Sequence, residues 1–347
     1  MTRQRLTDLL GVQVPIALGA FGGVSSVELT AQVSRLGGLG SYGLYGYDAA
    51  RISETIGALR AATTEPFAVN LWVPTGDEVR PEDVDLDPAL AAAEPLFDTV
   101  GVPRPQLPAA FLPDFGAQIA AVIEARPPVV SFVFGLPEPA VMNRLQKAGI
   151  RVLGTATTVE EAVHVARGGA DAIIATGLEA GGHRVSFLRP AEESLVGTFA
   201  LVPQVVDAVD VPVLAAGGIA DRRGVAAARA LGAEGVLVGT AFLRTRQSAA
   251  SNAHRQAIAD AGAAGTVLTR AMSGRLSRGV RNRAVEVLES GGQVAPFPAQ
   301  NWLTGQFRAV ANREGIGELQ SLWVGQGAGL ARYADAAEVF AELRAGL

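Results

Sequence analysis

The amino-acid sequence predicts an α/β fold, and within that class a (β/α)8 barrel, also called a TIM barrel. Three observations support this prediction. Short apolar segments alternate with longer segments of helical period, eight such pairs follow one another, and glycine pairs occur where barrels bind phosphate. An open, doubly wound sheet is the alternative, because counting strands does not exclude it. The positions of the glycines favour the barrel.

Each predicted strand is a short run rich in apolar or β-branched residues. The eight runs cover residues 15–19, 38–42, 67–71, 129–132, 151–155, 170–175, 213–216 and 235–238. Parallel strands need a crossover connection, so the segments between these runs are expected to form helices.

Three of the intervening segments carry start and stop signals for helices. The stretch "SSVELTAQVSRLGG" begins with a serine cap and ends at Gly37 and Gly38. The stretch "TTVEEAVHVARGGA" has Thr158 and Glu161 at the spacing of a capping box, and "DRRGVAAARALGAEG" begins at Asp221 as its cap. The sequence therefore predicts capped helices after the first, fifth and seventh strands.

Two segments depart from this alternation and define the predicted domains. Residues 73–117 interrupt the third unit and are rich in proline and acidic residues, and residues 266–305 follow the eighth unit. Insertions of this length are usually lids, binding loops or small domains, with neutral decoration as the alternative. We predict a barrel over residues 1–265 with an insertion at 73–117. A lid or small substrate domain follows over 266–305, and the C-terminal segment 306–347 packs back on the barrel.

Composition restricts the class of function. Of the 347 residues, 49% are hydrophobic and 18% are charged, so the chain can bury a large core. The sequence has no cysteine, which excludes disulfides, thiolate metal sites and cysteine nucleophiles and fits a cytoplasmic location. The net charge is −5, the arginines are dispersed, and neither a signal peptide nor a long apolar run is evident. We expect a cytoplasmic monomer or homodimer that binds no metal, nucleic acid or membrane.

Glycines at the ends of the seventh and eighth strands predict a phosphate site. Gly217 and Gly218 follow the seventh strand in "LAAGGIAD", and Gly239 and Thr240 follow the eighth in "VLVGTAF". In barrels these two loops commonly bind phosphate through backbone N–H groups, and glycine lets the backbone approach an anion closely. Turn formation without a ligand is the alternative interpretation.

Asn70 is the polar residue of the apolar strand "FAVNLWVP". Its amide can donate and accept hydrogen bonds at the edge of a heterocyclic ring, or it can be satisfied by neighbouring backbone. A third glycine pair, Gly22 and Gly23, follows the first strand. Together with the phosphate loops, these features indicate a mononucleotide, for which flavin mononucleotide (FMN) is the natural candidate in a barrel. No G-x-G-x-x-G pattern opens a helix in the first unit, which argues against a dinucleotide site.

His183 is the best candidate for catalysis among the three histidines. It follows Gly181 and Gly182 in "TGLEAGGHRVSF", on a predicted loop at the face where barrels place their active sites. The glycine pair would let this loop pass close over a flat cofactor. An imidazole titrates near neutrality, so it can accept a proton from a weak carbon acid or, when charged, hold an anion. His164 and His254 lie in helical patterns and are predicted to be surface or half-buried residues.

Two other groups of residues are ambiguous from sequence alone. An arginine cluster after the barrel is either a solvated face or a contact with a phosphate or an anionic substrate. It comprises Arg270, Arg275, Arg278, Arg281 and Arg283. The three tryptophans either line the site or belong to the core, as large aromatic residues more often do. They are Trp72, Trp302 and Trp323.

A set of motifs extends over about residues 10 to 335. They are "FGGVSSVELTAQVSRLGGLGS", "FAVNLWVP", "VVSFVFGLP", "GLEAGGHR", "VPVLAAGGIADRRGVAAARALGAEGVLVGTAFL", "TVLTRAMSGRLSRGVRNR" and "SLWVGQGAGL". Together they resemble the nitronate monooxygenases, formerly called 2-nitropropane dioxygenases. The E-A-G-G-H stretch and the pair G-G-I-A-D and G-T-A-F are the most specific parts of this resemblance.

The resemblance implies an FMN-dependent enzyme that oxidises alkyl nitronates, such as propionate 3-nitronate, with O₂ to a carbonyl compound and nitrite. His183 would stabilise the anion or deprotonate a neutral nitroalkane. The residues expected to bind FMN, from the glycine pattern and the resemblance, are Ala20, Phe21, Gly22, Asn70, Thr176, Gly181, Gly182, Gly217, Gly218, Leu237, Val238, Gly239 and Thr240.

Three positions depart from the family pattern. Thr176 stands where the family often has glutamine, Phe21 where it often has methionine, and Val133 where many members have a polar residue. The last two imply a more apolar pocket wall and hence an altered substrate preference.

Other functions use the same scaffold. An NAD(P)H-dependent FMN reductase of quinones or enoyl thioesters would share these motifs, and a flavin-binding protein without catalysis would keep the phosphate loops. A sugar-phosphate isomerase or aldolase is disfavoured, because no lysine stands at a strand end where a Schiff base would need it.

Overall fold

The computed structural model describes residues 5–347 and confirms the predicted barrel. Eight parallel strands are hydrogen-bonded in the order β1-β9-β8-β6-β5-β4-β3-β2, and a parallel bridge between Ala17 and Leu39 joins β1 to β2. The strands are β1 Ile16–Leu18, β2 Gly40–Gly43, β3 Phe67–Trp72, β4 Val129–Val133, β5 Arg151–Ala156, β6 Ala172–Thr176, β8 Val213–Ala216 and β9 Gly235–Val238. The ring is thereby closed, as barrel topology requires.

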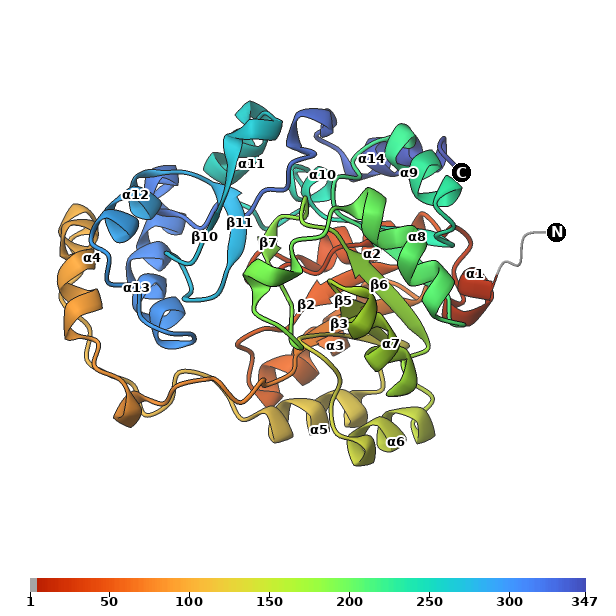
Figure 1. Ribbon diagram of the computed structural model, residues 1–347, viewed down its shortest axis with the longest axis horizontal. Helices are drawn as coiled ribbons and strands as arrows, with labels where there is room; N and C mark the ends of the chain where they lie inside the picture. The colour runs from red at the N-terminus through yellow and green to blue at the C-terminus, as the bar shows by residue number, and fades with distance from the viewer. Residues whose placement is uncertain (1–4) are drawn as a thin grey trace.

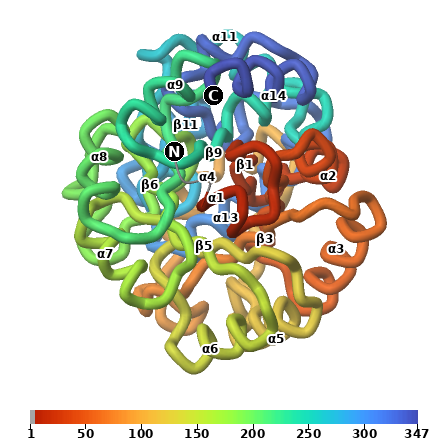
Figure 2. The backbone as a smooth tube through the Cα atoms, turned by 90° about the vertical axis from the view of Figure 1, so that its right-hand side faces the viewer, coloured from red at the N-terminus to blue at the C-terminus, as the bar shows by residue number. Residues whose placement is uncertain are grey.

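Helices surround the strands, as Figure 2 shows. They are α2 Val27–Arg35, α3 Ala49–Ala62, α5 Phe115–Ala125, α6 Pro139–Lys147, α7 Val159–Arg167, α8 Thr198–Ala208, α9 Arg222–Ala230 and α14 Ala336–Arg344. The last of these comes from the end of the chain and packs against α2, α9 and β1, where it fills the remaining place in the ring. The predicted caps are confirmed, since Ser26, Thr158 and Asp221 each accept a backbone N–H at the start of their helices.

Glu161 differs from the predicted capping box. Thr158 caps α7, but the fully buried Glu161 carboxylate does not bond back to it. Oε2 accepts hydrogen bonds from the backbone N–H and the hydroxyl of Thr157. Oε1 accepts them from the backbone N–H groups of Phe187 and Leu188. The carboxylate therefore ties the segment that follows His183 to the end of β5.

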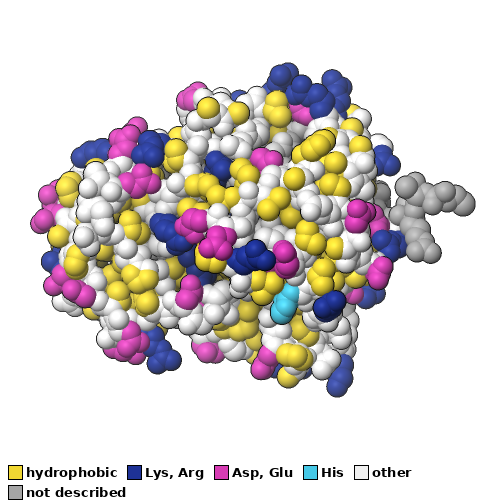
Figure 3. Space-filling view, in the orientation of Figure 1, with side chains coloured by type: hydrophobic (Ala, Val, Ile, Leu, Met, Phe, Trp, Pro, Cys, Tyr) yellow, Lys and Arg dark blue, Asp and Glu magenta, His cyan; other side chains and the backbone are white. Residues whose placement is uncertain are grey.

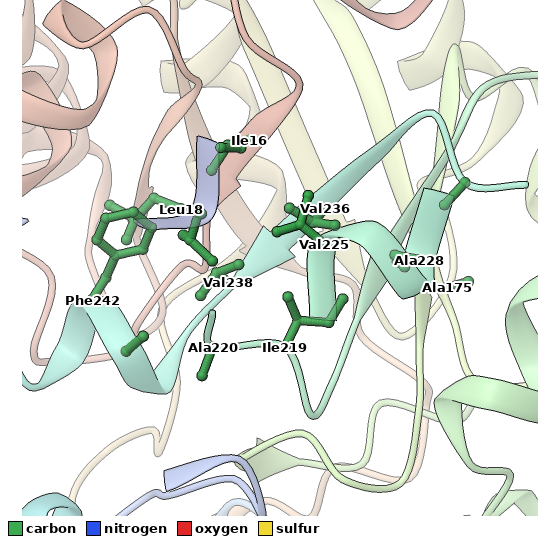
Figure 4. Packing of buried hydrophobic residues seen from close by; sticks show 14 of the residues in the cluster. Ile16, Leu18, Ala175, Ile219, Ala220, Val225, Ala228, Val236, Val238 and Phe242 are labelled. Atoms are coloured by element: carbon green, nitrogen blue, oxygen red, sulfur yellow. The ribbon is translucent and has the colours of Figure 1, made fainter. Parts of the chain in front are cut away.

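The inside of the barrel is filled at the end where the strands begin. Helix α1, Arg5–Leu10, places Leu6 and Leu10 among inward-facing residues of the strands. A separate apolar layer lies between strands and helices, where Figure 4 shows Leu18, Val236 and Val238 among the packed side chains. With one end filled, the predicted site residues at the opposite, carboxyl end are left around an open space.

The two segments that interrupt the alternation join in one lobe beside the barrel, on the left of Figure 1. It holds α4 Asp87–Val100, α12 Arg283–Ser290 and α13 Ala299–Glu314, which share one apolar cluster. Helix α13 runs unbroken through residue 305, the position of a domain boundary predicted from the sequence. Apolar contacts along the whole helix hold its two halves in the same lobe. The division into a barrel and a functional lid remains a prediction.

A small antiparallel sheet connects this region to the predicted catalytic segment. It comprises β7 Gly182–His183, β10 Thr266–Thr269 and β11 Ser277–Val280. His183 pairs with Ser277, and Gly182 pairs with Arg278. His183 is therefore in a short strand and not in a loop, because the post-barrel segment supplies the backbone partner. Figure 1 shows β7 and β11 where the barrel meets the lobe.

The remaining elements are short and lie in the insertion, between β7 and α8, and in the segment after β9. They are the helices α10 Thr240–Leu243 and α11 Asn252–Asp260, with short 3₁₀ turns at Pro81–Asp83, Ala191–Ser194, Ala263–Gly265, Gly317–Leu319 and Ala328–Leu330. No helix within residues 5–347 has the length and apolar character needed to cross a membrane. On the face drawn in Figure 3, basic and acidic side chains are interspersed, so that this face carries no basic stripe for a nucleic-acid backbone.

Candidate active site

A cavity of about 420 Å³ opens at the carboxyl ends of the strands. It is lined by the predicted residues Ala20, Phe21, Gly22, Asn70, Thr176, Gly181, Gly182, His183, Gly217, Gly218, Leu237, Gly239 and Thr240. Val238 is the exception, because its fully buried side chain faces the apolar layer between strands and helices. Phe21, Val133 and Thr176, the three departures from the family pattern, also line the cavity.

The glycine loop after β8 has the form of an anion cradle. Gly217 has a φ of 103°, and a Cβ added there would lie 2.8 Å from the hydroxyl oxygen of Thr198. The backbone can follow this path only without a side chain. Beside it, Thr240 Oγ1 accepts a hydrogen bond of 3.0 Å from the N–H of Gly325, which leaves its hydroxyl proton free for a ligand. These groups fit the phosphate of FMN.

Two buried arginines support the loop between β6 and this cradle. Arg184 donates to the carbonyls of Thr176 and Gly177, and Arg278 donates to the carbonyl of Leu178. Burial lowers the pKa of Arg184 to about 10, so it stays cationic at neutral pH. Both guanidiniums interact with the carboxylate of Glu179, which also lines the cavity, so their positive charge is partly balanced within the loop.

Polar side chains near the strand ends could hold the ring of the cofactor. Ser41, Asn70, Ser131, Thr155 and Thr176 all line the cavity. Nδ2 of Asn70 donates to the backbone oxygen of Ser131 at 3.1 Å and to its hydroxyl oxygen at 3.0 Å. Neighbouring groups thus satisfy the amide nitrogen, while Oδ1 remains as an acceptor for a ring N–H. The donor and acceptor set fits a flavin ring.

His183 lies between two tryptophans at this cavity. Its ring centroid is 4.9 Å from that of Trp72 and 5.3 Å from that of Trp323. Nε2 shares a hydrogen bond of 2.7 Å with the hydroxyl of Ser273, which is fully buried. Three sides of the imidazole are therefore fixed by residues from β3, the post-barrel segment and the chain end.

This environment keeps the imidazole neutral. Burial, with Arg275 and Arg308 nearby, lowers the pKa of His183 from 6.5 to about 3. A group with so low a pKa is a weak base, so it is poorly suited to remove a proton from carbon. His183 was predicted either to accept a proton from carbon or to hold an anion. The geometry supports the second role, in which the imidazole orients an anion by hydrogen bonding.

The same pKa predicts how stability depends on pH. Between about pH 3 and 6.5 the unfolded chain binds a proton at His183 and the folded chain does not. The free energy of unfolding therefore falls as the pH drops through this interval. His254, whose pKa is also lowered by burial, adds to the effect. Denaturant titrations from pH 7 to 4 should show a smaller slope for His183→Asn, and an unchanged slope would contradict the assignment.

The other two histidines have different surroundings. His164 on α7 is exposed, as predicted. His254 on α11 is only 2% exposed, so the expectation of a surface or half-buried position is wrong. Its Nε2 bonds to the backbone oxygen of Trp323 at 3.1 Å. Packing of α11 against the chain end buries it, and the bond helps to place a tryptophan that contacts His183.

Gly181, before His183, lies too close to the C-terminal segment of the chain to carry a side chain, which the sequence did not indicate. A Cβ on Gly181 would lie 2.6 Å from the backbone nitrogen of Gly325. Gln326, from the same segment, donates its backbone N–H to the oxygen of Glu179 at 2.9 Å. The motif around His183 is therefore in direct backbone contact with the C-terminal motif.

The arginine cluster divides between structural and surface roles, and none of its five members lines the cavity. Arg275 pairs with Asp77 at 2.5 Å and with Glu78 at 2.8 Å, and its guanidinium lies over Phe134 and Phe297. Arg278 is buried as described above. The remaining three are partly or largely exposed: Arg270 pairs with Glu192, Arg281 pairs with Glu289, and Arg283 lies at the surface.

A second cavity of about 450 Å³ adjoins the first. Tyr45, Trp72 and Phe297 border both cavities, and the rings of Tyr45 and Trp72 are 4.3 Å apart. Residues 78–82 and 109–115 of the insertion form much of its wall. The insertion therefore lies beside the candidate active site, separated from it by aromatic side chains. Trp302 does not line either cavity and packs in the lobe.

Several polar residues that line the first cavity were not predicted from the sequence: Ser41, Tyr45, Ser131, Thr155, Glu179, Asn301 and Arg308. Three of them, Tyr45, Asn301 and Arg308, lie together on the side of the lobe. Tyr45 follows β2, and its hydroxyl accepts a hydrogen bond of 3.0 Å from Nδ2 of Asn301. Arg308 donates to the side-chain oxygen of Asn301 at 2.8 Å. Both belong to α13, and their separation of seven residues puts them on one helix face. That spacing could have indicated from the sequence that the two residues share a helix face. Only the tertiary packing shows that this face points toward the barrel.

Comparisons with known proteins agree with this geometry. The family model described as nitronate monooxygenase matches residues 3–346. A probable nitronate monooxygenase of Staphylococcus aureus strain JH9 is 40% identical over 339 residues, which cover 95% of this chain and 93% of the relative.

Solved structures show the same relationship. Nitroalkane oxidase from Streptomyces ansochromogenes has a TM-score of 0.88 and 36% identity, and the alignment covers 99% of this chain and 97% of that one. FabK from Thermotoga maritima has a TM-score of 0.76 and 31% identity, with 99% and 95% covered.

Proposed function

Because this chain belongs to the nitronate monooxygenase family, we propose that it uses FMN to oxidise alkyl nitronates with O₂ to a carbonyl compound and nitrite. The observation that carries this proposal is a neutral, half-buried imidazole at the mouth of a cavity that has an anion cradle at its rim. The absence of cysteine supports a cytoplasmic location as part of the proposal.

The chain offers a group for each part of the cofactor. The loops at Gly217–Gly218 and Gly239–Thr240 would bind the phosphate, and Oδ1 of Asn70 would accept from the ring. When bound, FMN would supply one-electron chemistry between the electron-rich nitronate carbon and O₂. The atoms balance if one O₂ serves two nitronates, which yields two carbonyl compounds and two nitrites.

The protein side chains would position the substrate. Trp72 and Trp323 hold the imidazole of His183 and make an apolar wall from which water is displaced when substrate binds. With the hydroxyl of Ser273 donating to Nε2, the neutral imidazole would carry its proton on Nδ1 and would donate that N–H to the anion. Because the substrate arrives already ionised, no strong base is required.

This proposal predicts a preference for the ionised substrate. At neutral pH, kcat/KM for a nitronate should exceed that for the corresponding uncharged nitroalkane by at least about 100-fold, the range that general-base catalysis typically contributes. Oxygen consumption with freshly prepared nitronate and with nitroalkane would measure the ratio. Equal values would show that a base acts in the site and would contradict the neutral-imidazole mechanism.

One experiment separates nitronate oxidation from the main alternative. The likeness to FabK at 31% identity supports a reductase that uses NAD(P)H on the same scaffold. Purified protein should be mixed without oxygen with propionate 3-nitronate and, separately, with NADPH, while the flavin absorbance is followed. Bleaching by the nitronate supports our proposal. Rapid bleaching by NADPH alone supports the reductase, and no bleaching by either donor supports a non-catalytic flavin protein.

A further inference from the structure

Phe134 has a backbone conformation that its residue type rarely adopts. Its φ is 64°, and the next residue, Gly135, has a φ of 98°. Within residues 5–347 the other non-glycine residue with a positive φ is Arg126, which ends α5, a place where left-handed residues are common. For a bulky side chain this conformation is costly, and it persists where the surroundings fix it, often at functional sites.

The left-handed turn decides which way the side chain of Phe134 points. The residue directly follows β4, whose last residue, Val133, lines the first cavity. A strand continued in regular alternation would put Phe134 on the same side as Phe132, in the apolar layer between strands and helices. Instead its ring lies 5.0 Å from that of Trp72, and the side chain is buried. The turn therefore directs the phenyl ring toward the candidate active site.

The same ring holds a buried cation. The guanidinium carbon of Arg275 is 4.5 Å from the ring centroid of Phe134 and 4.1 Å from that of Phe297. An aromatic ring attracts a cation placed over its face, and the attraction is stronger where water is excluded. Phe134 thus contacts two side chains at once, the indole of Trp72 and the guanidinium of Arg275.

Both of these side chains act on His183. The rings of Trp72 and His183 are 4.9 Å apart, so the indole forms one side of the imidazole's enclosure. Arg275 is one of the two cations whose charge disfavours the protonated imidazole. Phe134 does not line the cavity itself, so it can influence the site only through these neighbours.

Other charged and titratable groups face the imidazole from the elements packed around it. They are Tyr45, Asp77, Glu78, Glu179 and Arg308, in addition to Arg275. Asp77 and Glu78 pair with Arg275, and burial raises the pKa of Tyr45 to about 12, so its phenol is neutral. Glu179 accepts hydrogen bonds from Thr198. Of the two arginines that lower the pKa of the imidazole, Arg275 is the one that Phe134 contacts.

We propose that Phe134 is a positioning residue of the active site, whose ring, turned inward by the left-handed backbone, fixes Trp72 and Arg275 in the places from which they act on His183. The contacts with these two side chains offset the cost of the backbone conformation. The inference rests on the proposed function only for its effect on turnover.

Titration of the imidazole tests this role without turnover. Phe134→Leu keeps an apolar side chain but removes the flat ring, so that water and a less fixed Arg275 should make protonation of His183 easier. We expect its pKa, about 3 in the wild type, to rise by about one unit. At pH 4 the imidazole would then be about half protonated, against about a tenth in the wild type. NMR of FMN-loaded protein with labelled histidine would measure this, with His183→Asn to assign the signal.

Two further variants separate the ring from the fold and from the backbone. Phe132→Leu makes the same change two residues earlier, at a fully buried side chain of the outer apolar layer. It should lower the melting temperature and leave the titration of His183 unchanged. Phe134→Gly removes the ring, while glycine adopts a positive φ without strain. It should raise the pKa of His183 as Phe134→Leu does. Melting temperatures and flavin absorbance would confirm that each variant is folded and loaded.

Turnover gives a second, separate measurement. In Phe134→Leu, kcat for propionate 3-nitronate should fall about 10- to 100-fold, because a small displacement of an orienting group has an effect of this size. Phe132→Leu should keep the wild-type kcat. A shifted titration in a protein that oxidises no nitronate would support the positioning role and refute the proposed reaction.

Three results would overturn the inference. An unchanged titration of His183 in Phe134→Leu does so, whatever happens to turnover. An unchanged titration in Phe134→Gly assigns the effect to the backbone turn instead of the ring. An equal shift in Phe132→Leu shows that any loss of packing in β4 loosens the site, so that Phe134 has no special role.

Discussion

His183→Asn is expected to retain FMN and to lose most nitronate turnover. The side chain lies at the cavity but outside the phosphate cradle, so cofactor binding should not depend on it. Removing one preorganised hydrogen-bond donor from an enclosed site typically lowers kcat by about 100- to 1000-fold. The visible spectrum of the purified variant would report the cofactor, and oxygen consumption with propionate 3-nitronate would report turnover.

Two comparisons make this result specific. His164→Asn changes an exposed histidine on α7 and should leave turnover at the wild-type value. Ser273→Ala removes the partner of Nε2 and should give an intermediate kcat, because the imidazole remains but loses its fixed orientation. Full activity of His183→Asn would remove this residue from the mechanism.

Gly217→Ala is expected to abolish stable cofactor binding. The added Cβ would lie 2.8 Å from Thr198 Oγ1 and 3.1 Å from the carbonyl oxygen of Gly177, at a φ of 103° that alanine rarely adopts. The loop must move, and its N–H groups would no longer converge on a phosphate. Loss of two charge-assisted hydrogen bonds would weaken FMN binding at least about 100-fold. The flavin absorbance after gel filtration and titration with free FMN would measure the effect.

A matched substitution separates backbone strain from loss of the cradle. Gly101 ends α4 in the lobe with a φ of 66°, and a Cβ there would have no atom within 4 Å. Gly101→Ala should lower stability by about 1 to 2 kcal/mol through the left-handed backbone alone, while FMN content stays normal. Normal FMN affinity in Gly217→Ala would show that the loop after β8 is not the phosphate site.

Local patterns were enough to predict the barrel and to place all but one of the predicted site residues at one cavity. Caps at Ser26, Thr158 and Asp221 and the runs of apolar residues act over a few neighbouring residues, so they can be recognised along the chain. Barrel topology then brings all strand ends to one face. For this reason the predicted glycines, Asn70 and His183 line the same cavity, although they are far apart in sequence. Val238 does not line the cavity, because neighbouring strand residues face opposite sides of the sheet.

The tertiary structure alone decided the chemistry of His183. Its pairing with β11, its bond to Ser273 and its contact with Trp323 join segments separated by about ninety residues or more, for which the sequence has no local signal. The low pKa follows from that enclosure and from the nearby charges of Arg275 and Arg308. In the sequence, Arg308 has the pattern of an ordinary helix residue. Only the packing of α13 against the barrel places it at the cavity. Residue types and spacings determined where the active site forms, whereas burial and charge, which depend on distant contacts, decided what its groups can do.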